Sequence, residues 1–484
     1  MQDAGRFLEK CAEAREILLS LSNPMVINHY DCDGLASGAI VYDFLMKNGK
    51  MPKIMTVKQL KPENISGFAS SFKEVVFVDL GANLSAIKEI KTALTIDHHQ
   101  TEELGYFQAN PMLYGVDGGS EISSSGVAYL VCSPESGVWG LESRVQSLEF
   151  RDPRLKTQDH YAELALVGAL GDMQYPLEGM NRMIADQGIK AGRIEERIDL
   201  TLFGKHARSI RSMLLYADPY LPGITGNEEL CKFIIESSGI TEQQGTKWAS
   251  YYDCPEEERK RLVSSLVRFL AEGGYGKLAK SLIGPVYLLP KLIPELREAQ
   301  EFSTMLNACG RNGRFDLGMQ LCFGNFTDEV ANLLATHRKN LRDGIAFAIS
   351  NMQDLGPFYL IDGRGAISEN IIGVVCGMIY STARHDKPII GLANEEITSS
   401  ELRVSITIPE TGNPKPETIK ISSRAAKPLV AAGVNLGAIM KECSLVVEGA
   451  GGGHRMAAGA TIPKEKLEEF LAGVSHAIQK TSSV

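Results

Sequence analysis

The chain has 484 residues, of which 44% are hydrophobic and 23% charged, and this composition predicts a globular protein of two or three domains. Its net charge of −9 argues against broad, non-specific adhesion to nucleic acid, although it leaves room for a local basic groove. No run approaches the roughly 20 apolar residues of a membrane span, and residues 1–21 read as a charged amphipathic helix, so we expect a cytoplasmic protein without a membrane partner. The nine cysteines are scattered and never spaced as C-x-x-C, which indicates reduced thiols rather than a zinc site or disulfides.

The first part of the chain, residues 1–185, predicts an α/β domain. Short β-rich runs such as "MVIN", "VVFVDL" and "LTID" alternate with helical or loop segments, which is the rhythm of a parallel sheet. Residues 186–300 then become helical, as in "PEEERKRLVSSLVRFLAEGG", where one apolar stripe follows a charged start and consists of Leu262, Leu266, Phe269 and Leu270. We interpret this second part as an inserted helical domain.

The last part of the chain, residues 346–484, predicts a second α/β domain. Connecting helices over residues 301–345 lead to it, ending in the helical pattern "TDEVANLLATHRKNLRDGIAFAIS". The strand-like runs "FYLIDG", "KPIIGLA" and "LRVSITI" follow, and the domain closes with "VVEGAGGGHRMAAGATI". The stretch "PETGNPKPE", residues 409–417, is expected to form a hairpin or loop inside this domain.

Three potential metal ligands follow the first predicted strand. The stretch "INHYDCDGLAS" places His29, Asp31 and Asp33 at alternate positions directly after the apolar "PMVI". Cys32 lies between two of them, and in extended backbone its side chain would point away from theirs. We therefore expect Cys32 to pack in the interior rather than to bind an ion.

Further acidic and imidazole groups end apolar runs that we expect to be parallel strands. Asp79 ends "VVFVD", Asp97, His98 and His99 follow "LTI", and Asp172 closes "LALVGALGD". Open α/β sheets place their ligand crevice at the carboxyl ends of strands. Any one Asp after a strand is more often a turn former or helix cap, but four such sites in one domain make that explanation strained. Carboxylate and imidazole without thiolate suit Mn²⁺ or Mg²⁺ better than Zn²⁺, and several carboxylates favour two ions over one.

A glycine-rich stretch near the end of the chain predicts a second kind of site. Consecutive glycines let backbone N–H groups approach a phosphate, although such a stretch alone is about as often a simple turn. The predicted phosphate-binding residues are Gly451, Gly452, Gly453, His454 and Arg455 in "GAGGGHRMAAGA". Arg311 in "NACGR" and Arg424 in "ISSRA" are further candidates, because a guanidinium binds two phosphate oxygens at once.

These motifs resemble the DHH phosphoesterase superfamily. "HYDCDG", "VDLG", "DHH" and "GALGD" appear in the order of its four motifs, and "GGGHRMAAGA" is similar to the signature of its associated C-terminal domain. "LNACGR" resembles the RecJ branch, and the helical insertion resembles the archaeal RecJ-like nucleases related to a eukaryotic replicative-helicase subunit. We expect these 484 residues to lack a counterpart of the extra OB-fold of bacterial RecJ proteins.

The resemblance implies a fold and a site. The fold would consist of a DHH domain with a parallel sheet and a DHH-associated C-terminal domain, facing each other across a cleft, with the helical domain inserted. The site would hold two divalent ions, Mn²⁺ in preference to Mg²⁺. One ion would be bound by His29, Asp31 and Asp79, and the other by Asp33, Asp79, His98 and Asp172, with Asp79 bridging.

The catalytic roles beside the metal ligands are assigned to Asp97, His99 and His454. Asp97 would orient a histidine, because an imidazole ligand usually donates its other N–H to a carboxylate or carbonyl. His99 and His454 would donate hydrogen bonds to the phosphate. Two ions about 3.5–4 Å apart lower the pKa of a bridging water and stabilise the attacking and leaving oxygens, so no protein general base is required.

We predict a metal-dependent exonuclease that hydrolyses single-stranded DNA or RNA from an end, in DNA replication or repair. Two alternatives stay open: a DHH phosphodiesterase acting on short oligonucleotides or cyclic dinucleotides, and a scaffold that binds the GINS complex and the replicative helicase. The complete ligand set argues against a pure scaffold, because a cluster of like charges is costly to keep.

Overall fold

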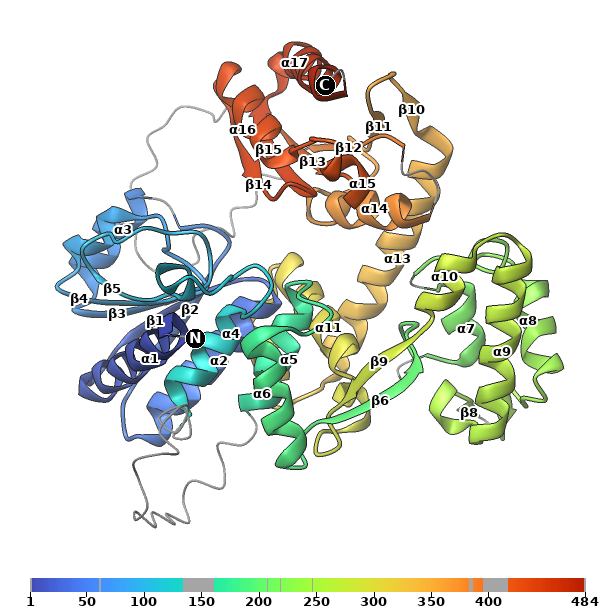
Figure 1. Cartoon of the computed structure of the whole chain (residues 1–484), viewed down its shortest axis with the longest axis horizontal. Helices are drawn as coiled ribbons and strands as arrows, with labels where there is room; N and C mark the ends of the chain where they lie inside the picture. The colour runs from blue at the N-terminus through green and yellow to red at the C-terminus, as the bar shows by residue number, and fades with distance from the viewer. Residues whose placement is uncertain are drawn as a thin grey trace. The chain divides into compact units, whose positions relative to one another are not determined.

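The computed structural model describes most of the chain, namely residues 2–60, 62–133, 161–206, 208–217, 219–245, 247–382, 386–394 and 417–482. Contacts between residues divide the chain into two compact units, Met1–Thr201 with Ser281–Leu333 and Leu202–Lys280 with Leu334–Val484 (Figure 1). Within the described ranges, no helix has both the length and the apolar character needed to cross a membrane. All nine cysteines are free, as predicted.

The first unit contains a five-stranded parallel sheet, which confirms the predicted α/β fold. The strand order is β2-β1-β3-β4-β5. The strands are β1 (Met25–His29), β2 (Lys53–Val57), β3 (Glu74–Val78), β4 (Thr92–Ile96) and β5 (Phe107–Ala109). β-branched and apolar residues dominate the central strands, and their burial between two layers explains the continuous apolar runs. Chain order reverses between β1 and β3, so these strands flank a topological switch point, where ligands bind in such sheets.

Helices cover both faces of this sheet. On one face, α3 (Pro62–Ser71) and the short helix η1 (Ser85–Glu89) pack over a core that includes Ile27 and Phe77. On the other face lie α1 (Gln2–Ser20), α2 (Cys32–Lys47) and α4 (Ser124–Cys132) (Figure 1). The unit is completed by η2 (Pro111–Tyr114), α5 (Tyr161–Gly171), α6 (Gly179–Lys190), η6 (Pro294–Leu296), α11 (Ala299–Arg311) and α12 (Phe315–Cys322).

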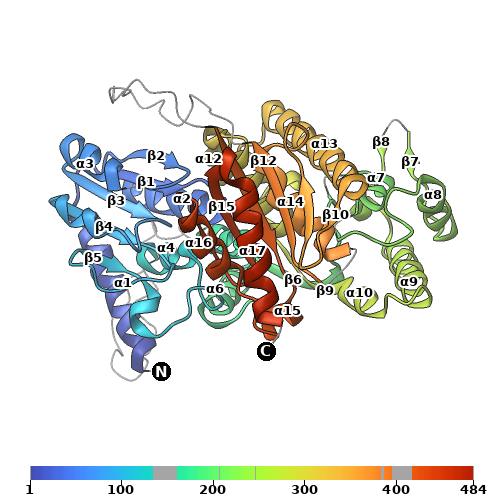
Figure 2. The same ribbon diagram turned by 90° about the horizontal axis from the view of Figure 1, so that it is seen from above.

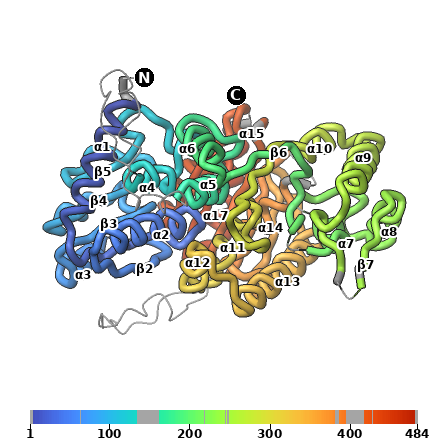
Figure 3. The backbone as a smooth tube through the Cα atoms, turned by 90° about the horizontal axis from the view of Figure 1, so that it is seen from below, coloured from blue at the N-terminus to red at the C-terminus, as the bar shows by residue number. Residues whose placement is uncertain are grey.

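One predicted strand is a helix. The run "LALVGAL" lies inside α5, which contacts α2, α4, α6 and α11, and the helices around α5 can be followed in Figure 3. The prediction that Asp172 follows a parallel strand is therefore wrong. An apolar run of this length occurs both in buried strands and in helices that are covered on all sides, and its periodicity does not separate the two.

The segment predicted as a helical insertion begins and ends in a two-stranded ribbon. β6 (Glu195–Leu200) and β9 (Ile283–Leu288) pair antiparallel, with Glu195 opposite Leu288. The strand "EERIDL" is mostly charged, so no strand pattern marks it. Between the two strands lie α7 (Ile210–Leu215), α8 (Glu228–Ser237), β7 (Gln243–Gln244), β8 (Lys247–Trp248), η5 (Tyr251–Asp253), α9 (Glu256–Glu272) and α10 (Gly276–Ser281). In α9 the predicted stripe is buried at Leu262, Leu266 and Leu270.

The C-terminal part of the chain forms a six-stranded mixed sheet, which confirms the second α/β domain. Its order is β10-β11-β12-β13-β15-β14. The strands are β10 (Gln353–Asp354), β11 (Tyr359–Asp362), β12 (Ile389–Asn394), β13 (Thr418–Arg424), β14 (Ala450–Gly453) and β15 (Ala457–Pro463). The helices are α13 (Asp328–Asn351), α14 (Glu369–Thr382), α15 (Lys427–Ala431), α16 (Leu436–Val446), η8 (Lys464–Lys466) and α17 (Leu467–Ser482).

Two hydrophobic cores flank this second sheet. α13 and α14 pack on one face, where Ile389 and Ala393 point, and α16 with α17 pack on the other, where Ile390 and Leu392 point (Figure 2). The predicted strand "LRVSITI" and residues 409–416 of the predicted loop lie outside the described residues. The predicted domain boundaries at residues 185, 300 and 345, and the facing of the two α/β domains, stay predictions.

Candidate metal centre and phosphate-binding residues

The first ligand group sits where β1 ends and α2 begins. His29 is the last residue of β1, Asp31 caps the helix by accepting a hydrogen bond from Gly34 N at 3.0 Å, and Asp33 lies buried in the first helical turn. The sequence suggested that the three residues alternate along one extended strand. In the structure the strand ends at His29 and the helix begins at Cys32. Cys32 is interior, as expected, but for a different reason. It is the first residue of α2, and its thiol donates to Val167 O at 3.3 Å.

Asp79 follows β3 and lies between the histidine groups. Its carboxylate is 2% exposed, and its two oxygens lie 3.2 Å from His29 Nδ1 and 3.6 Å from His98 Nε2. Its φ angle is 60°, in the left-handed region that Asp and Asn tolerate better than most residues. The parallel pairing of β1 with β3 brings Asp79 to His29, although 50 residues separate them in the chain.

The residues Asp97, His98 and His99 form a turn after β4. Asp97 is buried and its oxygens accept from Ala82 N at 3.0 Å, His98 N at 2.8 Å and His99 Nδ1 at 2.8 Å. His98 Nδ1 lies 2.6 Å from Gly118 O, which can only accept, so Nδ1 must carry the proton. The other ring nitrogen, Nε2, therefore faces the carboxylates with its lone pair available in the neutral imidazole.

Asp172 reaches the cluster from the end of α5. Its Oδ2 lies 3.8 Å from His98 Nε2, and it accepts a hydrogen bond from Gln174 Nε2 at 2.9 Å. Gln174 also donates to Gly118 O at 2.8 Å and accepts from Asn181 Nδ2 at 2.6 Å. The buried amide of Gln174 thus bonds both Asp172 and Gly118 O, the carbonyl oxygen that accepts from His98 Nδ1, and so fixes their orientations relative to each other.

Three consecutive buried serines at the start of α4 were missed by the sequence reasoning. The backbone N–H groups of Ser124 and Ser125 donate to the two oxygens of Asp33 at 2.7 and 3.0 Å, and Ser124 Oγ donates to Asp79 Oδ1 at 2.8 Å. An ionised carboxylate at a helix N-terminus is stabilised by the helix dipole and by these donors. The signal "SSS" before an apolar helical run indicates a helix start, but nothing in it indicates which carboxylates the helix contacts.

Burial of the cluster and repulsion between its carboxylates raise the pKa values of some of them. Burial and the neighbouring charge of Asp31 raise the pKa of Asp79 to about 7, and burial and the charge of Asp33 raise that of Asp172 to about 6. At His29, burial is the largest influence and would lower the pKa, but the charges and hydrogen bonds of Asp31 and Asp79 together outweigh it and hold the pKa of the imidazole well above its ordinary range. Protons therefore partly neutralise the cluster in the absence of cations.

The donor set fits divalent cations. One atom each from His29, Asp31 and Asp79 lie within 4.8 Å of one another, and so do atoms of Asp79, His98 and His99. Asp79 belongs to both groups, so one carboxylate could be shared between two ions. Hard carboxylate oxygens with imidazole nitrogen suit Mn²⁺ and Mg²⁺, and cations would relieve the like-charge repulsion that raises the pKa of Asp79.

We expect metal binding to become tighter as the pH rises from about 5 to about 8, because ligands must lose their protons to bind an ion. With pKa values of about 7 and about 6, Asp79 and Asp172 hold protons at pH 6 that Mn²⁺ must displace, whereas both are ionised above pH 8. Calorimetric titration with Mn²⁺ in two buffers of different ionisation enthalpy should therefore show more protons released at pH 6 than at pH 8. An affinity and a proton release that do not change over this range would contradict the assignment.

Replacing Ser124 with alanine should weaken Mn²⁺ binding by about 10-fold, because the ionised form of Asp79 loses a direct hydrogen-bond donor. The backbone N–H of Ser124 still donates to Asp33, so the fold should lose only about 1 kcal/mol of stability. Ser444→Ala is the matched control: Ser444 is also buried and donates to Lys441 O, but lies in the C-terminal domain. Equal Mn²⁺ affinities for the two variants would refute a role for Ser124 at the metal centre.

Arg311 is near the first ligand group. It ends α11, and burial lowers the pKa of its guanidinium while the nearby charges of Tyr30 and Asp31 oppose that shift. A partly buried guanidinium beside the ligand-bearing loop is well placed to bind an anion there. The structure therefore brings Arg311 together with the predicted metal ligands of the same unit.

The glycine-rich stretch is a strand rather than a loop. Gly451–Gly453 belong to β14, which pairs with β15, and only His454, Arg455 and Met456 form the turn between them. A Cβ atom on Gly451 would lie 2.6 Å from Met440 O in α16, so this glycine serves close packing of helix on strand. β14 is an edge strand, so only alternate N–H groups of Gly451–Gly453 can bond to β15, and the phosphate-binding role of the stretch stays a prediction.

Arg424 lies beside this turn. It is the last residue of β13, where it pairs with Ala457 of β15, and the next residue, Ala425, donates its backbone N–H to Met456 O at 2.8 Å. The C-terminal sheet thus gathers Arg424, His454 and Arg455 at one end. His454 and Arg455 are exposed, which leaves their side chains accessible to an anionic ligand.

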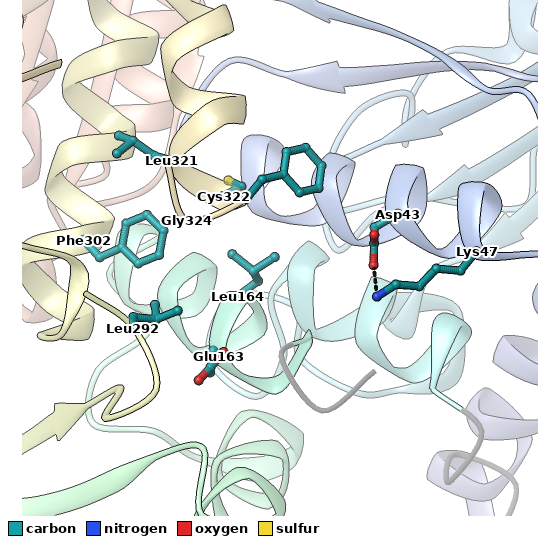
Figure 4. Close-up of a pocket in the computed structure, with 10 residues that line it drawn as sticks. Asp43, Lys47, Glu163, Leu164, Leu292, Phe302, Leu321, Cys322 and Gly324 are labelled. Carbon is teal, nitrogen blue, oxygen red and sulfur yellow. Dashed lines mark ion pairs between the residues drawn. The ribbon is translucent and has the colours of Figure 1, made fainter. Parts of the chain in front are cut away.

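A cavity of about 270 Å³ lies elsewhere in the first unit. Figure 4 shows it among α2, α5, α11 and α12, with Leu164, Phe302 and Leu321 in its walls and the ion pair of Asp43 and Lys47 at 2.7 Å near its edge. None of the predicted site residues lines it. The metal centre is therefore identified by its donor atoms and not by this hollow.

An α/β sheet with carboxylates and imidazoles at its switch point defines a class of protein that can bind divalent metals. The chain matches three domain families: the DHH family N-terminal domain over residues 24–169, the DHH-CID domain over residues 202–282 and the DHHA1 domain over residues 364–480. An uncharacterized protein from Methanocaldococcus jannaschii is 28% identical over an alignment of 501 positions, which covers 99% of each chain. The chain belongs to the DHH superfamily of phosphoesterases, a class of hydrolases.

Two solved structures show that its fold is RecJ-like. CDC45 from Entamoeba histolytica superposes with a TM-score of 0.61 at 12% identity, covering 98% of both chains. RecJ in complex with Mn²⁺ from Thermus thermophilus superposes with a TM-score of 0.56 at 16% identity, covering 98% of this chain and 55% of that one. The chain therefore spans about half the length of the T. thermophilus RecJ, and at these identities the likeness concerns the fold alone.

Proposed function

We propose that the protein is a metal-dependent exonuclease that hydrolyses phosphodiester bonds of single-stranded DNA or RNA from an end. The observation that carries this proposal is the shared position of Asp79, whose two oxygens face His29 on one side and His98 on the other. Membership of a phosphoesterase superfamily and the RecJ-like fold support the same reaction class. A role in DNA replication or repair is part of the proposal.

The ligand assignment follows the first group of donor atoms but departs from the second, because it takes Asp33 and Asp172 rather than His99 as ligands beside Asp79 and His98. His29, Asp31 and Asp79 would hold one ion, and Asp33, Asp79, His98 and Asp172 the other. Divalent ions bound there would supply a water of lowered pKa and stabilise negative charge on the reacting phosphate. The protein itself keeps these side chains in place through Ser124, Ser125 and Gln174.

His99 has a different task in this proposal. Its side chain is 46% exposed, and Asp97 binds its Nδ1. Burial is the largest influence and would lower its pKa, but the charge and hydrogen bond of Asp97, together with the charges of Asp79 and Asp172, outweigh burial and raise the pKa to about 10. An imidazolium at this position, held in one orientation by Asp97, would donate from Nε2 to a phosphate oxygen. Asp97 would act as the positioning residue for both histidines, because it accepts from the backbone N–H of His98 and from the backbone N–H and Nδ1 of His99.

Each unit by itself would offer basic side chains that bind phosphate groups of the substrate. In the first unit we assign this role to Arg311, which lies near Asp31. In the C-terminal domain we assign it to Arg424, His454 and Arg455, which share one end of the sheet. The glycines of β14 pack closely against α16, and their N–H groups at the edge of the sheet would add phosphate contacts beside this turn.

Digestion of single strands labelled at either end tests this function directly. DNA and RNA strands are incubated with Mn²⁺ or Mg²⁺, beside circular single-stranded DNA and dinucleotides. We expect mononucleotides to be released progressively from one end of the linear strands, and circular strands to stay intact. Ready cleavage of circles would refute the exonuclease, and much faster hydrolysis of dinucleotides would establish the small-substrate alternative instead.

A scaffold role is the second candidate, because the E. histolytica CDC45 and this chain cover 98% of each other in the structural superposition, and residues 202–282 match the DHH-CID domain. In this alternative the protein would bind the GINS complex and the replicative helicase. Size-exclusion chromatography of the purified chain with the GINS complex of its source tests the contact. Separate elution at micromolar concentrations would refute it.

A further inference from the structure

Asn307 connects two segments that carry predicted metal ligands. It lies in α11, far from both segments in the chain, and its side chain makes one hydrogen bond to each. Its Oδ1 accepts from Cys32 N at 3.1 Å, between Asp31 and Asp33, and its Nδ2 donates to Gly171 O at 3.3 Å, directly before Asp172. One amide therefore holds the start of α2 and the end of α5.

The three segments are packed too closely for any of them to shift alone. A Cβ atom on Gly310, one turn after Asn307 in α11, would lie 1.9 Å from Tyr30 O, and a Cβ on Gly171 would lie 2.4 Å from the Cβ and Sγ atoms of Cys32. At Gly310 the backbone of α11 therefore lies against the backbone of Tyr30, and at Gly171 the backbone of α5 lies against the side chain of Cys32. In such a junction, small displacements of one segment are transmitted to the others.

The chemistry of the position selects an amide. Cys32 N–H belongs to the first turn of α2 and has no acceptor within that helix. Gly171 is the last residue of α5, and its carbonyl oxygen has no donor within that helix. A carboxylate could accept from Cys32 but would repel Gly171 O, and a lysine could donate to Gly171 O but not accept. An asparagine satisfies both groups at once.

We propose that Asn307 is a positioning residue that sets the separation between the ligand group of His29, Asp31 and Asp33 and the ligand Asp172. The inference rests on the proposed metal-dependent function. Asp33 and Asp172 both approach His98 Nε2, at 4.0 and 3.8 Å, so the geometry of this group depends on how the two segments are aligned. Without the amide every ligand is still present, but the distance between the two ligand-bearing segments is no longer fixed.

The test compares two variants with a control on the same helix. Asn307→Leu keeps the volume of the side chain and removes both hydrogen bonds, and Asn307→Ala removes the bonds and the volume. Asn312→Ala is the control, because Asn312 Nδ2 also donates to a carbonyl, but to Ala308 O at 2.8 Å within the end of the same helix. Mn²⁺ affinity and stoichiometry are measured by calorimetry, and amide hydrogen exchange over residues 30–34 is measured without metal.

We expect both Asn307 variants to bind Mn²⁺ about 10- to 100-fold more weakly than the wild type, with faster exchange over residues 30–34, and the control to behave as the wild type in both measurements. If only packing mattered, leucine would restore Mn²⁺ affinity, and that result would overturn the inference. Wild-type Mn²⁺ affinity in either folded Asn307 variant would do the same. A wild-type protein that binds no Mn²⁺ would instead refute the proposed function, so the two failures are distinguishable.

Discussion

Replacing Asp79 with asparagine or alanine is expected to lower phosphodiesterase activity by about 10³-fold or more while the protein stays folded. Asp79 is the carboxylate common to both groups of donor atoms, and it is buried between His29 and His98. Asparagine keeps its size but removes the negative charge that two adjacent cations need. Activity and the Mn²⁺-induced rise in melting temperature are measured together, and both should fall.

The two substitutions should differ in the stability of the metal-free protein. The φ angle of 60° at Asp79 is tolerated by asparagine, whereas alanine there should cost roughly 1 kcal/mol. The pKa of Asp79 in the folded protein, about 7, lies above the value of about 4 for an unfolded chain. Its proton therefore stabilises the fold at low pH, and this contribution is lost as the pH rises through 7. Asp79→Asn should be at least as stable as the wild type at pH 8.

Asp186→Asn is the control for this experiment, because Asp186 is an exposed carboxylate of the same unit that pairs with Arg182 at 2.7 Å. It should leave activity and metal-dependent stabilisation unchanged. An Asp79 variant with wild-type activity and wild-type stabilisation by Mn²⁺ would overturn the two-metal assignment.

Replacing His454 with alanine is expected to lower kcat/KM by about 10²-fold and leave Mn²⁺ binding unchanged, whereas the Asp79 substitutions should reduce both. His454 begins the exposed turn between β14 and β15, where it makes a backbone hydrogen bond to Ala457 O at 2.8 Å that alanine preserves. The folded C-terminal domain should therefore persist with only the imidazole missing. Steady-state kinetics on a labelled single strand and calorimetric titration with Mn²⁺ measure the two effects separately.

His476→Ala serves as the comparison for His454, because His476 lies on α17 of the same domain and outside the predicted site. We expect wild-type kinetics for it. If His454→Ala weakened Mn²⁺ binding as strongly as it weakened activity, His454 would have to be assigned to the metal centre. Unchanged kinetics would remove it from the site altogether.

Much of the candidate metal centre could be predicted from the sequence for a simple geometric reason. His29 ends β1, Asp79 follows β3 and the residues 97–99 follow β4, and all three strands are parallel neighbours. The carboxyl ends of parallel neighbours meet at one edge, so residues that are local in sequence to those ends become close in space. No knowledge of packing was needed to bring these groups together.

The errors have a different origin. The run "LALVGAL" before Asp172 is apolar throughout and so favours a strand, whereas in the structure it is a helix that contacts α2, α4, α6 and α11. The glycine-rich composition of residues 451–453 predicts a loop, whereas in the structure they belong to strand β14, where α16 lies against Gly451. In both cases the decisive information was the neighbouring element, which local periodicity does not contain.

Hydrophobic pattern and the chemistry of short stretches were enough to predict the α/β class and the residue types that can bind a divalent ion, because each of these is a local property of the chain. Which polar residues hold those ligands became clear only from the folded arrangement. Ser124, Gln174 and Asn307 are ordinary in their local sequence, yet the side chain of each bonds a group at or beside a predicted ligand. Their contribution arises from donor and acceptor atoms meeting across the interior, and that arrangement exists only once the helices have packed.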